Sequence, residues 1–105
     1  MGFPSIFSPG RLGRLEVKNR LVMPPMVRNY ATESGLVTDR YIAHIERVAK
    51  GGVGLMILEA SYVARNGKGF VNELGIHEDA CIPGLARLAA AAHEHGALIG
   101  PQLYH

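Results

Sequence analysis

Three apolar segments of this chain each give way abruptly to residues of another kind. The first ends in Pro24-Pro25-Met26, the second in Glu59-Ala60-Ser61, and the third runs through Gly100-Pro101-Gln102 to the end of the chain. Because proline lacks an N–H and fixes φ, Pro24 and Pro25 end sheet pairing and turn the backbone outward. Ligands of α/β proteins bind at such strand ends, so the sequence predicts a binding site where the first segment stops.

The loop after the double proline carries side chains that can contact a ligand. Arg28, Asn29 and Tyr30 follow Met26-Val27 directly. Loops that leave a strand end carry binding and catalytic groups more often than the strands themselves. We therefore treat these three residues as candidate substrate contacts, without predicting which of them faces the substrate.

Other titratable residues have both a functional and a structural interpretation. A carboxylate at a strand end, such as Glu59, can act as a general base, but we favour a structural ion pair. His93 and His95 are two residues apart and point to different helix faces, so they predict no metal site. Arg65 and Lys68 fall among turn-forming residues, where we expect solvated side chains and keep contact with a substrate phosphate as the alternative.

Cys81 is the only cysteine of the chain, and this count limits its redox and metal chemistry. An internal disulfide is excluded, and neither a four-cysteine zinc site nor an iron–sulfur cluster can be built from this chain alone. Such a cluster would need cysteines beyond His105. We expect Cys81 to pack in the interior near the start of a helix.

The first half of the chain has the pattern of a hairpin, a strand and a helix. Residues 3–19 suit a short antiparallel hairpin around Gly13, and residues 21–23 suit a strand. Apolar residues then recur at helical spacing from an N-cap at Thr38 or Asp39 to Gly51-Gly52. These positions predict one amphipathic helix between the first strand and the second.

The second half repeats strand, helix and strand. Residues 53–58 are continuously apolar and predict a strand buried on both faces. Pro83 stands at the first turn of a predicted helix that Gly96 closes, and a strand follows from Ala97. The order predicts an α/β fold with parallel strands and right-handed crossovers.

Two architectures have this order of elements. A doubly wound sheet normally carries a glycine-rich turn after its first strand, and no G-x-G-x-x-G or Walker A sequence occurs in this chain. A (β/α)8 TIM barrel needs no such turn and has its site at the carboxyl ends of its strands. Because a barrel takes about 250 residues, a chain of 105 residues supplies only its first part.

Five segments of the chain resemble the old yellow enzyme family of flavin-dependent ene-reductases and related NADH:flavin oxidoreductases. They are Phe7-Ser8-Pro9, Lys18 to Met26, Gly35 to Thr38, Gly52 to Ala60, and Ile99 to His105. Family members fold as an FMN-holding (β/α)8 barrel with an N-terminal hairpin at its bottom. The resemblance implies that residues 1–105 are the N-terminal fragment of one FMN-binding barrel domain. Residues 1–19 would form the hairpin cap and residues 20–105 the first βα units.

The resemblance also implies a set of FMN contacts. Pro24, Pro25 and Met26 would lie along the flavin, Ala60 would approach its isoalloxazine ring, and Gln102 would hydrogen-bond the pyrimidine edge. These residue types suit FMN, whose ring is a flat apolar body with a polar rim, and the amide of Gln102 both donates and accepts. We therefore expect these residues to form part of a cofactor site.

Val27 belongs to the same set of cofactor-binding residues but departs from the family pattern. Relatives often have threonine or cysteine at this position, where a hydrogen bond tunes the flavin potential. Valine cannot donate that bond. The hydrogen bond that tunes the flavin in those relatives is therefore absent at this position.

The reaction implied by the resemblance is hydride transfer from NADH or NADPH to FMN, and then to the activated C=C bond of an α,β-unsaturated carbonyl or similar small molecule. The groups that grip the substrate and donate the proton lie on later strands in the family, so the catalytic residues are expected beyond His105. Two alternatives stay open. One is a flavin-independent barrel enzyme for a phosphate-bearing ligand, and the other is a non-catalytic barrel fragment that forms homo-oligomers.

The composition argues against two classes of partner. The net charge is +2 and the basic residues are scattered, which gives no electrostatic footprint for nucleic acid or anionic lipid. No apolar run approaches the roughly 20 residues of a membrane span. Residues 1–10 also lack the order of a signal peptide. We expect a cytoplasmic protein in a reducing compartment.

Overall fold

The computed structural model describes residues 2–105, and its first part is a helical turn followed by a hairpin. The two hairpin strands pair antiparallel and reverse at Gly13, whose φ of 61° is in the left-handed region that favours glycine. The hairpin predicted in residues 3–19 is thus present in residues 10–17, whereas residues 4–7 form a helical turn that the sequence did not predict. The elements are α1 (Pro4–Phe7), β1 (Gly10–Leu12) and β2 (Leu15–Val17).

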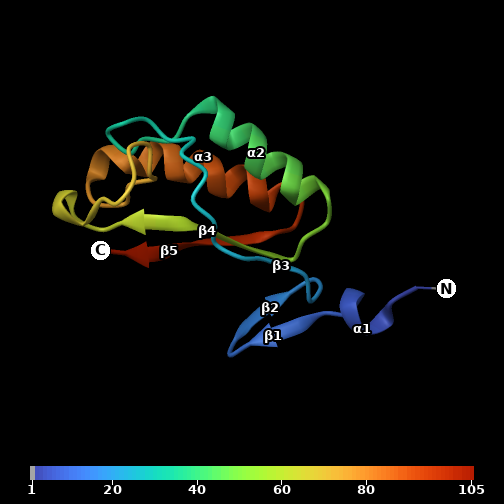
Figure 1. Ribbon diagram of the computed structural model, residues 1–105. Helices are drawn as coiled ribbons and strands as arrows, with labels where there is room; N and C mark the ends of the chain where they lie inside the picture. Colours follow the sequence, from blue (N-terminus) through green and yellow to red (C-terminus); the bar gives the residue numbers. More distant parts are fainter. Residues whose placement is uncertain (1) are drawn as a thin grey trace.

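The rest of the chain forms a parallel α/β unit (Figure 1). Its sheet has the order β3-β4-β5, and both strand pairs are parallel, as the sequence predicts. The strands are β3 (Val22–Met23), β4 (Leu55–Tyr62) and β5 (Leu98–Tyr104). The connecting helices are α2 (Asp39–Lys50) and α3 (Ile82–His93), with short 3-10 turns η1 (Arg65–Gly67) and η2 (Asp79–Cys81) between β4 and α3.

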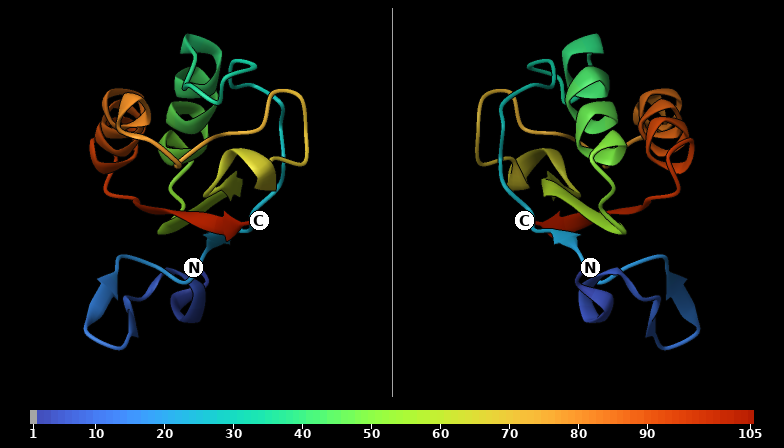
Figure 2. Two further views of the ribbon diagram at one scale, coloured as in Figure 1. Left: turned by 90° about the vertical axis from the view of Figure 1, so that its left-hand side faces the viewer. Right: turned by 90° about the vertical axis from the view of Figure 1, so that its right-hand side faces the viewer.

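Both long helices cover the same face of the sheet, and the hairpin lies on the other side of it (Figure 2). The core between the sheet and the helices contains Tyr41 and Ile45 from α2, Met56 from β4 and Leu88 from α3, each at most 1% exposed. No helix within residues 2–105 is long and apolar enough to cross a membrane.

The hairpin is attached at the amino ends of the sheet strands. Lys18 donates a hydrogen bond from Nζ to the carbonyl of His95 (2.6 Å), just before β5. Asn19 donates from Nδ2 to the carbonyl of Gly52 (2.6 Å), just before β4, and its Oδ1 accepts from the N–H of Leu21. The hairpin therefore leaves the carboxyl ends of all three sheet strands open.

Helix α2 begins with a side-chain cap. Thr38 has extended backbone dihedrals, and its Oγ1 accepts a hydrogen bond from the N–H of Tyr41 (3.2 Å). The same hydroxyl donates to the carbonyl of Tyr30, which ties the loop after β3 to the helix. The cap and the buried stripe of Tyr41, Ile45 and Ala49 orient the helix on the sheet.

Substitution of Thr38 by alanine is expected to destabilise the chain by about 1 kcal/mol, because alanine leaves an N–H of the first turn unpaired. Thr38→Ser retains the hydroxyl, so its loss of stability is expected to be less than half of the loss caused by alanine. Urea unfolding followed by far-UV circular dichroism measures both variants. A serine variant as unstable as the alanine variant would mean that packing of the threonine methyl group, and not the cap, matters here.

Strand β4 is longer than the predicted segment 53–58. It continues to Tyr62, whose N–H donates to the carbonyl of Leu74 (3.1 Å) and whose carbonyl accepts from Ile76 (3.0 Å). Ser61 donates from Oγ to the carbonyl of Glu59 (2.8 Å), so this polar residue is satisfied inside the strand. The sequence pattern misses the extension because the partners of these polar groups lie far along the chain.

Candidate functional site

The ends of the three sheet strands lie side by side. Met23 pairs with Met56, so the Pro24–Met26 segment continues β3 alongside the carboxyl half of β4. Ala60 pairs with Gln102 in the neighbouring strand. The structure therefore brings together the three segments that the sequence singled out.

Ala60 and Gln102 face the open side of the sheet, opposite the helices. Met56 and Ile99 are paired and both pack toward the helix-side core. Side chains alternate along a strand, so Gln102, three residues after Ile99, points to the other face, where it is exposed. Ala60 shares that face because directly paired residues point the same way.

A β-bulge at Glu59 makes this arrangement possible. The register between β4 and β5 shifts between Leu58 and Ala60, which leaves Glu59 as the extra residue. Strict alternation from Leu58 would place Ala60 on the helix side of the sheet. The bulge therefore decides on which face of the sheet the Ala60 side chain lies.

The Pro24–Met26 segment has the properties of an apolar shelf. Pro24 and Met26 are exposed, with Met26 58% exposed, whereas Pro25 and Val27 are half-buried. An exposed apolar segment after β3 and an exposed primary amide at Gln102 of β5, with β4 between them, match the chemistry of FMN, whose ring needs apolar contact on its face and a donor and acceptor at its edge. The residues present thus fit the cofactor that the resemblance implies.

The three candidate substrate residues point in different directions. Tyr30 packs edge-on against Tyr41 and His44 of α2, with ring centroids 6.4 Å and 5.6 Å away. Asn29 has a φ of 58°, and its Oδ1 accepts a hydrogen bond from the N–H of Asn72 (3.1 Å). Arg28 is exposed. Tyr30 is therefore part of the packing on α2, Asn29 is hydrogen-bonded to the backbone of Asn72, and Arg28 lines a small cavity beside Tyr41 and His44.

The predicted ion pair of Glu59 is not formed within residues 2–105. The side chain is 2% exposed, and its Oε2 accepts a hydrogen bond from the N–H of Leu74 (3.1 Å). Its neighbour on the helix side is the phenol of Tyr41, whose pKa is raised by burial and, after that, by the Glu59 carboxylate. The sequence gave no indication that Glu59 and Tyr41 lie together, because the spacing of Tyr41 indicates only that it belongs to the apolar stripe of α2.

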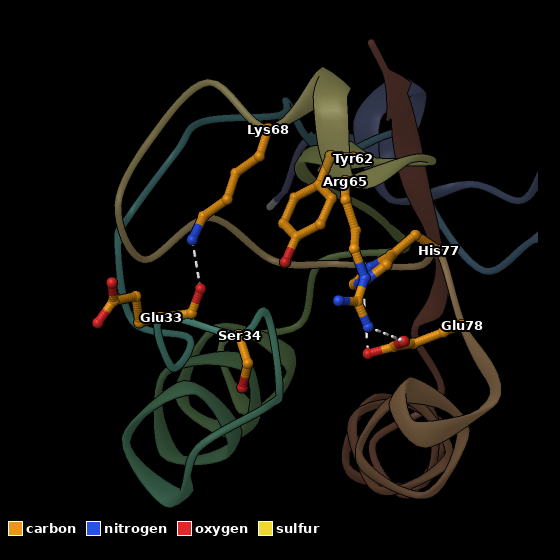
Figure 3. Close-up of a pocket in the computed structure, with 7 residues that line it drawn as sticks. All are labelled: Glu33, Ser34, Tyr62, Arg65, Lys68, His77 and Glu78. Carbon is orange, nitrogen blue, oxygen red and sulfur yellow. Dashed lines mark hydrogen bonds and ion pairs between the residues drawn. The ribbon is translucent and has the colours of Figure 1, made fainter.

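A polar cavity of about 240 Å³ lies beside the carboxyl end of β4 (Figure 3). One wall is the ring of Tyr62, which stacks on His77 with centroids 4.6 Å apart. Arg65 is paired with Glu78 at 2.8 Å, and this guanidinium holds the pKa of Glu78 below its ordinary value. The lining residues are Glu33, Ser34, Tyr62, Arg65, Lys68, His77 and Glu78.

The two cations of this cavity already have partners within the chain. Lys68 donates from Nζ to the carbonyl of Glu33, and Arg65 is engaged by Glu78. The side chain of Arg65 is otherwise 80% exposed, in line with the predicted solvated loop. The lining also has two carboxylates, Glu33 and Glu78, so the cavity offers no excess of positive charge for a substrate phosphate.

Cys81 and Glu73 both lie in the interior of the chain. Cys81 is buried at the start of α3, as predicted, with its Sγ 4.0 Å from Nδ1 of His77. Sequence reasoning missed Glu73, which is fully buried and accepts hydrogen bonds at Oε1 from the N–H groups of Gly69 and Phe70. The glycines at positions 67 and 69 were the available signal, since they mark the close approach of this loop to Tyr104 and His105.

Comparisons with known proteins identify the family of this chain. Residues 5–105 match the model of the NADH:flavin oxidoreductase / NADH oxidase family. The NADH oxidase of Thermoanaerobacter brockii is 44% identical over 104 residues, which are 98% of this chain and 16% of that protein. The NADPH dehydrogenase of Geobacillus sp. (strain WCH70) is 43% identical over 101 residues, which are 95% of this chain and 30% of that protein.

A solved structure shows the same fold. The crystal structure of Old Yellow Enzyme from Pichia sp. AKU4542 superposes with a TM-score of 0.89 at 30% identity, over 96% of this chain and 26% of that one. The chain thus spans less than a third of the length of these relatives. Because the family match covers residues 5–105, nearly the whole chain, the chain belongs to the NADH:flavin oxidoreductase / NADH oxidase family.

Proposed function

We propose that this chain forms the first part of an FMN-binding (β/α)8 barrel that transfers hydride from NADH or NADPH, by way of FMN, to a small-molecule acceptor. The observation that carries the proposal is the convergence of Pro24–Met26, Ala60 and Gln102 at the carboxyl ends of three adjacent parallel strands. Sites of (β/α)8 enzymes are built at this end of the strands. The names of the similar proteins, NADH oxidase and NADPH dehydrogenase, support the same reaction class.

Each proposed contact has a physical role. FMN, when bound, supplies two-electron hydride chemistry. Pro24, Pro25 and Met26 offer apolar surface that excludes water from one side of the ring, with Val27 next to them. Ala60 has only a methyl group, so the backbone of β4 can come close to the cofactor. Gln102 holds the ring edge through one donor and one acceptor.

The proposed acceptor is an activated alkene such as an α,β-unsaturated carbonyl. The resemblance to ene-reductases supports this choice, as does the likeness to Old Yellow Enzyme. Arg28 and Asn29 are the proposed substrate contacts in this chain because they follow the shelf and are exposed. We place the catalytic proton donor and the grip on the carbonyl in strands that follow His105.

A chimera tests the proposal. Residues 1–105 replace the matching segment of the Thermoanaerobacter brockii NADH oxidase, to which the chain is 44% identical. The purified chimera is expected to show flavin absorbance and to oxidise NADH, because the scaffold supplies the remaining strands. A chimera that folds by circular dichroism, yet takes up no FMN when it is added in excess, would refute the proposal. The unaltered NADH oxidase is the positive control.

A further inference from the structure

Glu59 is a buried carboxylate that the proposed FMN contacts do not include. It is 2% exposed, and Oε1 has no hydrogen-bond partner among residues 2–105, whereas Oε2 accepts from Leu74. A buried polar group without its partner costs about 1–3 kcal/mol, and more when it is charged. An apolar residue would fill this position at lower cost, so the carboxylate has a role other than packing.

The backbone at Glu59 is unusual as well. Glu59 is the extra residue of the bulge in β4, and its side chain turns toward α2. Bulges commonly re-aim a side chain beside a functional site. The bulge in β4 re-aims two side chains: it directs Glu59 to the helix side of the sheet and Ala60 to the open side.

The Glu59 carboxylate also faces the segment that continues β3. Together with Pro24 and Met26 it lines one small cavity of about 10 Å³, which is closed on the other side by Tyr41 and Ile45 of α2. Tyr41 is 1% exposed, and burial followed by the Glu59 carboxylate raises the pKa of its phenol, which keeps the hydroxyl protonated. Glu59 thus lies next to both parts of the proposed flavin site: it precedes Ala60 in β4, and its side chain lines a cavity with Pro24 and Met26.

We propose that Glu59 is a positioning residue that holds Ala60 and the Pro24–Met26 shelf in a fixed relation, through the hydrogen bond that it accepts from the Leu74 N–H and its place beside Tyr41 in the shared cavity. The inference rests on the proposed FMN site, because the role of Glu59 is to hold that site in its binding geometry before FMN arrives. Preformed contacts raise affinity by lowering the entropy lost when the ligand binds. Glu59 itself makes no contact with the cofactor in this proposal.

Variants of the chimera test the role of Glu59. Glu59→Ala is expected to weaken FMN affinity about tenfold, equivalent to about 1.4 kcal/mol, and to shift the visible spectrum of the bound flavin. Glu59→Gln has the same shape and keeps an oxygen for the Leu74 N–H, so it is expected to stay within about threefold of the parent chimera. Fluorescence titration of FMN into the apo-chimera measures affinity, and a thermal melt measures stability.

Glu73→Ala is the matched control. Glu73 is a second fully buried carboxylate with one oxygen unpartnered among residues 2–105, but it lies outside the cavity behind the shelf. Its removal is expected to lower the melting temperature while the flavin spectrum and FMN affinity stay unchanged.

The outcomes separate the two proposals. If the parent chimera binds no FMN, both the proposed function and the role of Glu59 are refuted. If it binds FMN, and Glu59→Ala and Glu73→Ala change affinity equally, only the role of Glu59 is refuted. Should Glu59→Ala not fold, Tyr41→Phe carries the test, because it removes the hydroxyl that faces Glu59. A flavin spectrum unchanged by Tyr41→Phe would then refute the positioning role.

Discussion

Replacement of Gly35 by alanine is expected to destabilise the chain by about 3 kcal/mol, the sum of a left-handed backbone and an overpacked contact. Gly35 has a φ of 89°, and a Cβ there would lie 2.9 Å from Cζ of Tyr62 and 3.1 Å from Cα of Gly75. Tyr62 cannot move aside easily, because it is 2% exposed and stacked on His77.

The contact at Gly35 also organises the loops next to the site. Its carbonyl accepts a hydrogen bond from the N–H of Gly75 (2.9 Å), which ties the loop after β3 to the loop after β4. A displaced Gly35 would therefore disturb both loops. Urea unfolding of the chain, followed by circular dichroism, measures the loss.

Gly13→Ala is the matched control for this prediction. Gly13 also has a positive φ, of 61°, but a Cβ there meets nothing within 4 Å. Alanine at this position is expected to lower stability by only about 1 kcal/mol, the cost of placing a residue with a Cβ in the left-handed region. Equal losses for the two variants would show that Tyr62 gives way and that the contact at Gly35 is not restrictive.

Gln102→Leu is expected to weaken FMN binding by the chimera about 30-fold, or about 2 kcal/mol. Leucine has a shape similar to that of glutamine but lacks the amide donor and acceptor. Gln102 is exposed on the open face of β5, so stability should change little. The amide is the one polar side chain among the proposed flavin contacts. Titration of the apo-chimera with FMN gives the dissociation constant, and a thermal melt checks that the fold is retained.

Leu103→Ala serves as the control on the same strand. Leu103 is 72% exposed and adjacent to Gln102, but it points away from the open face that Gln102 and Ala60 share. Its truncation is expected to leave the dissociation constant within about threefold of the parent chimera. An FMN affinity that survives Gln102→Leu would remove Gln102 from the proposed site and leave the apolar shelf as its main contact.

The sequence predicted the elements whose signals are local. Thr38 and Gly51-Gly52 mark the ends of α2, and the hairpin around Gly13 follows from a turn residue between apolar positions. N-caps, turns and helical spacing depend on residues a few positions apart, so they can be read without the fold. The double proline after Met23 is a signal of the same kind, and it indicated where β3 ends.

The sequence also predicted that the ends of three parallel strands lie together, but not which way their side chains face. Parallel strands put Pro24–Met26, Ala60 and Gln102 at one edge of the sheet by topology alone. The bulge at Glu59, which decides the orientation of Ala60, has no recognisable signal in the surrounding residues.

By itself, then, the sequence determined the order of elements, the hairpin, the strand ends and the family to which they point. Only the tertiary structure decided that Glu59 meets Tyr41 and Leu74 in place of an ion-pair partner, that β4 runs on to Tyr62, and that Tyr30 packs on α2. The physical reason is separation along the chain. Each of these contacts joins residues that lie a full strand, loop or helix apart, and such partners leave no mark on the local spacing of apolar and polar residues.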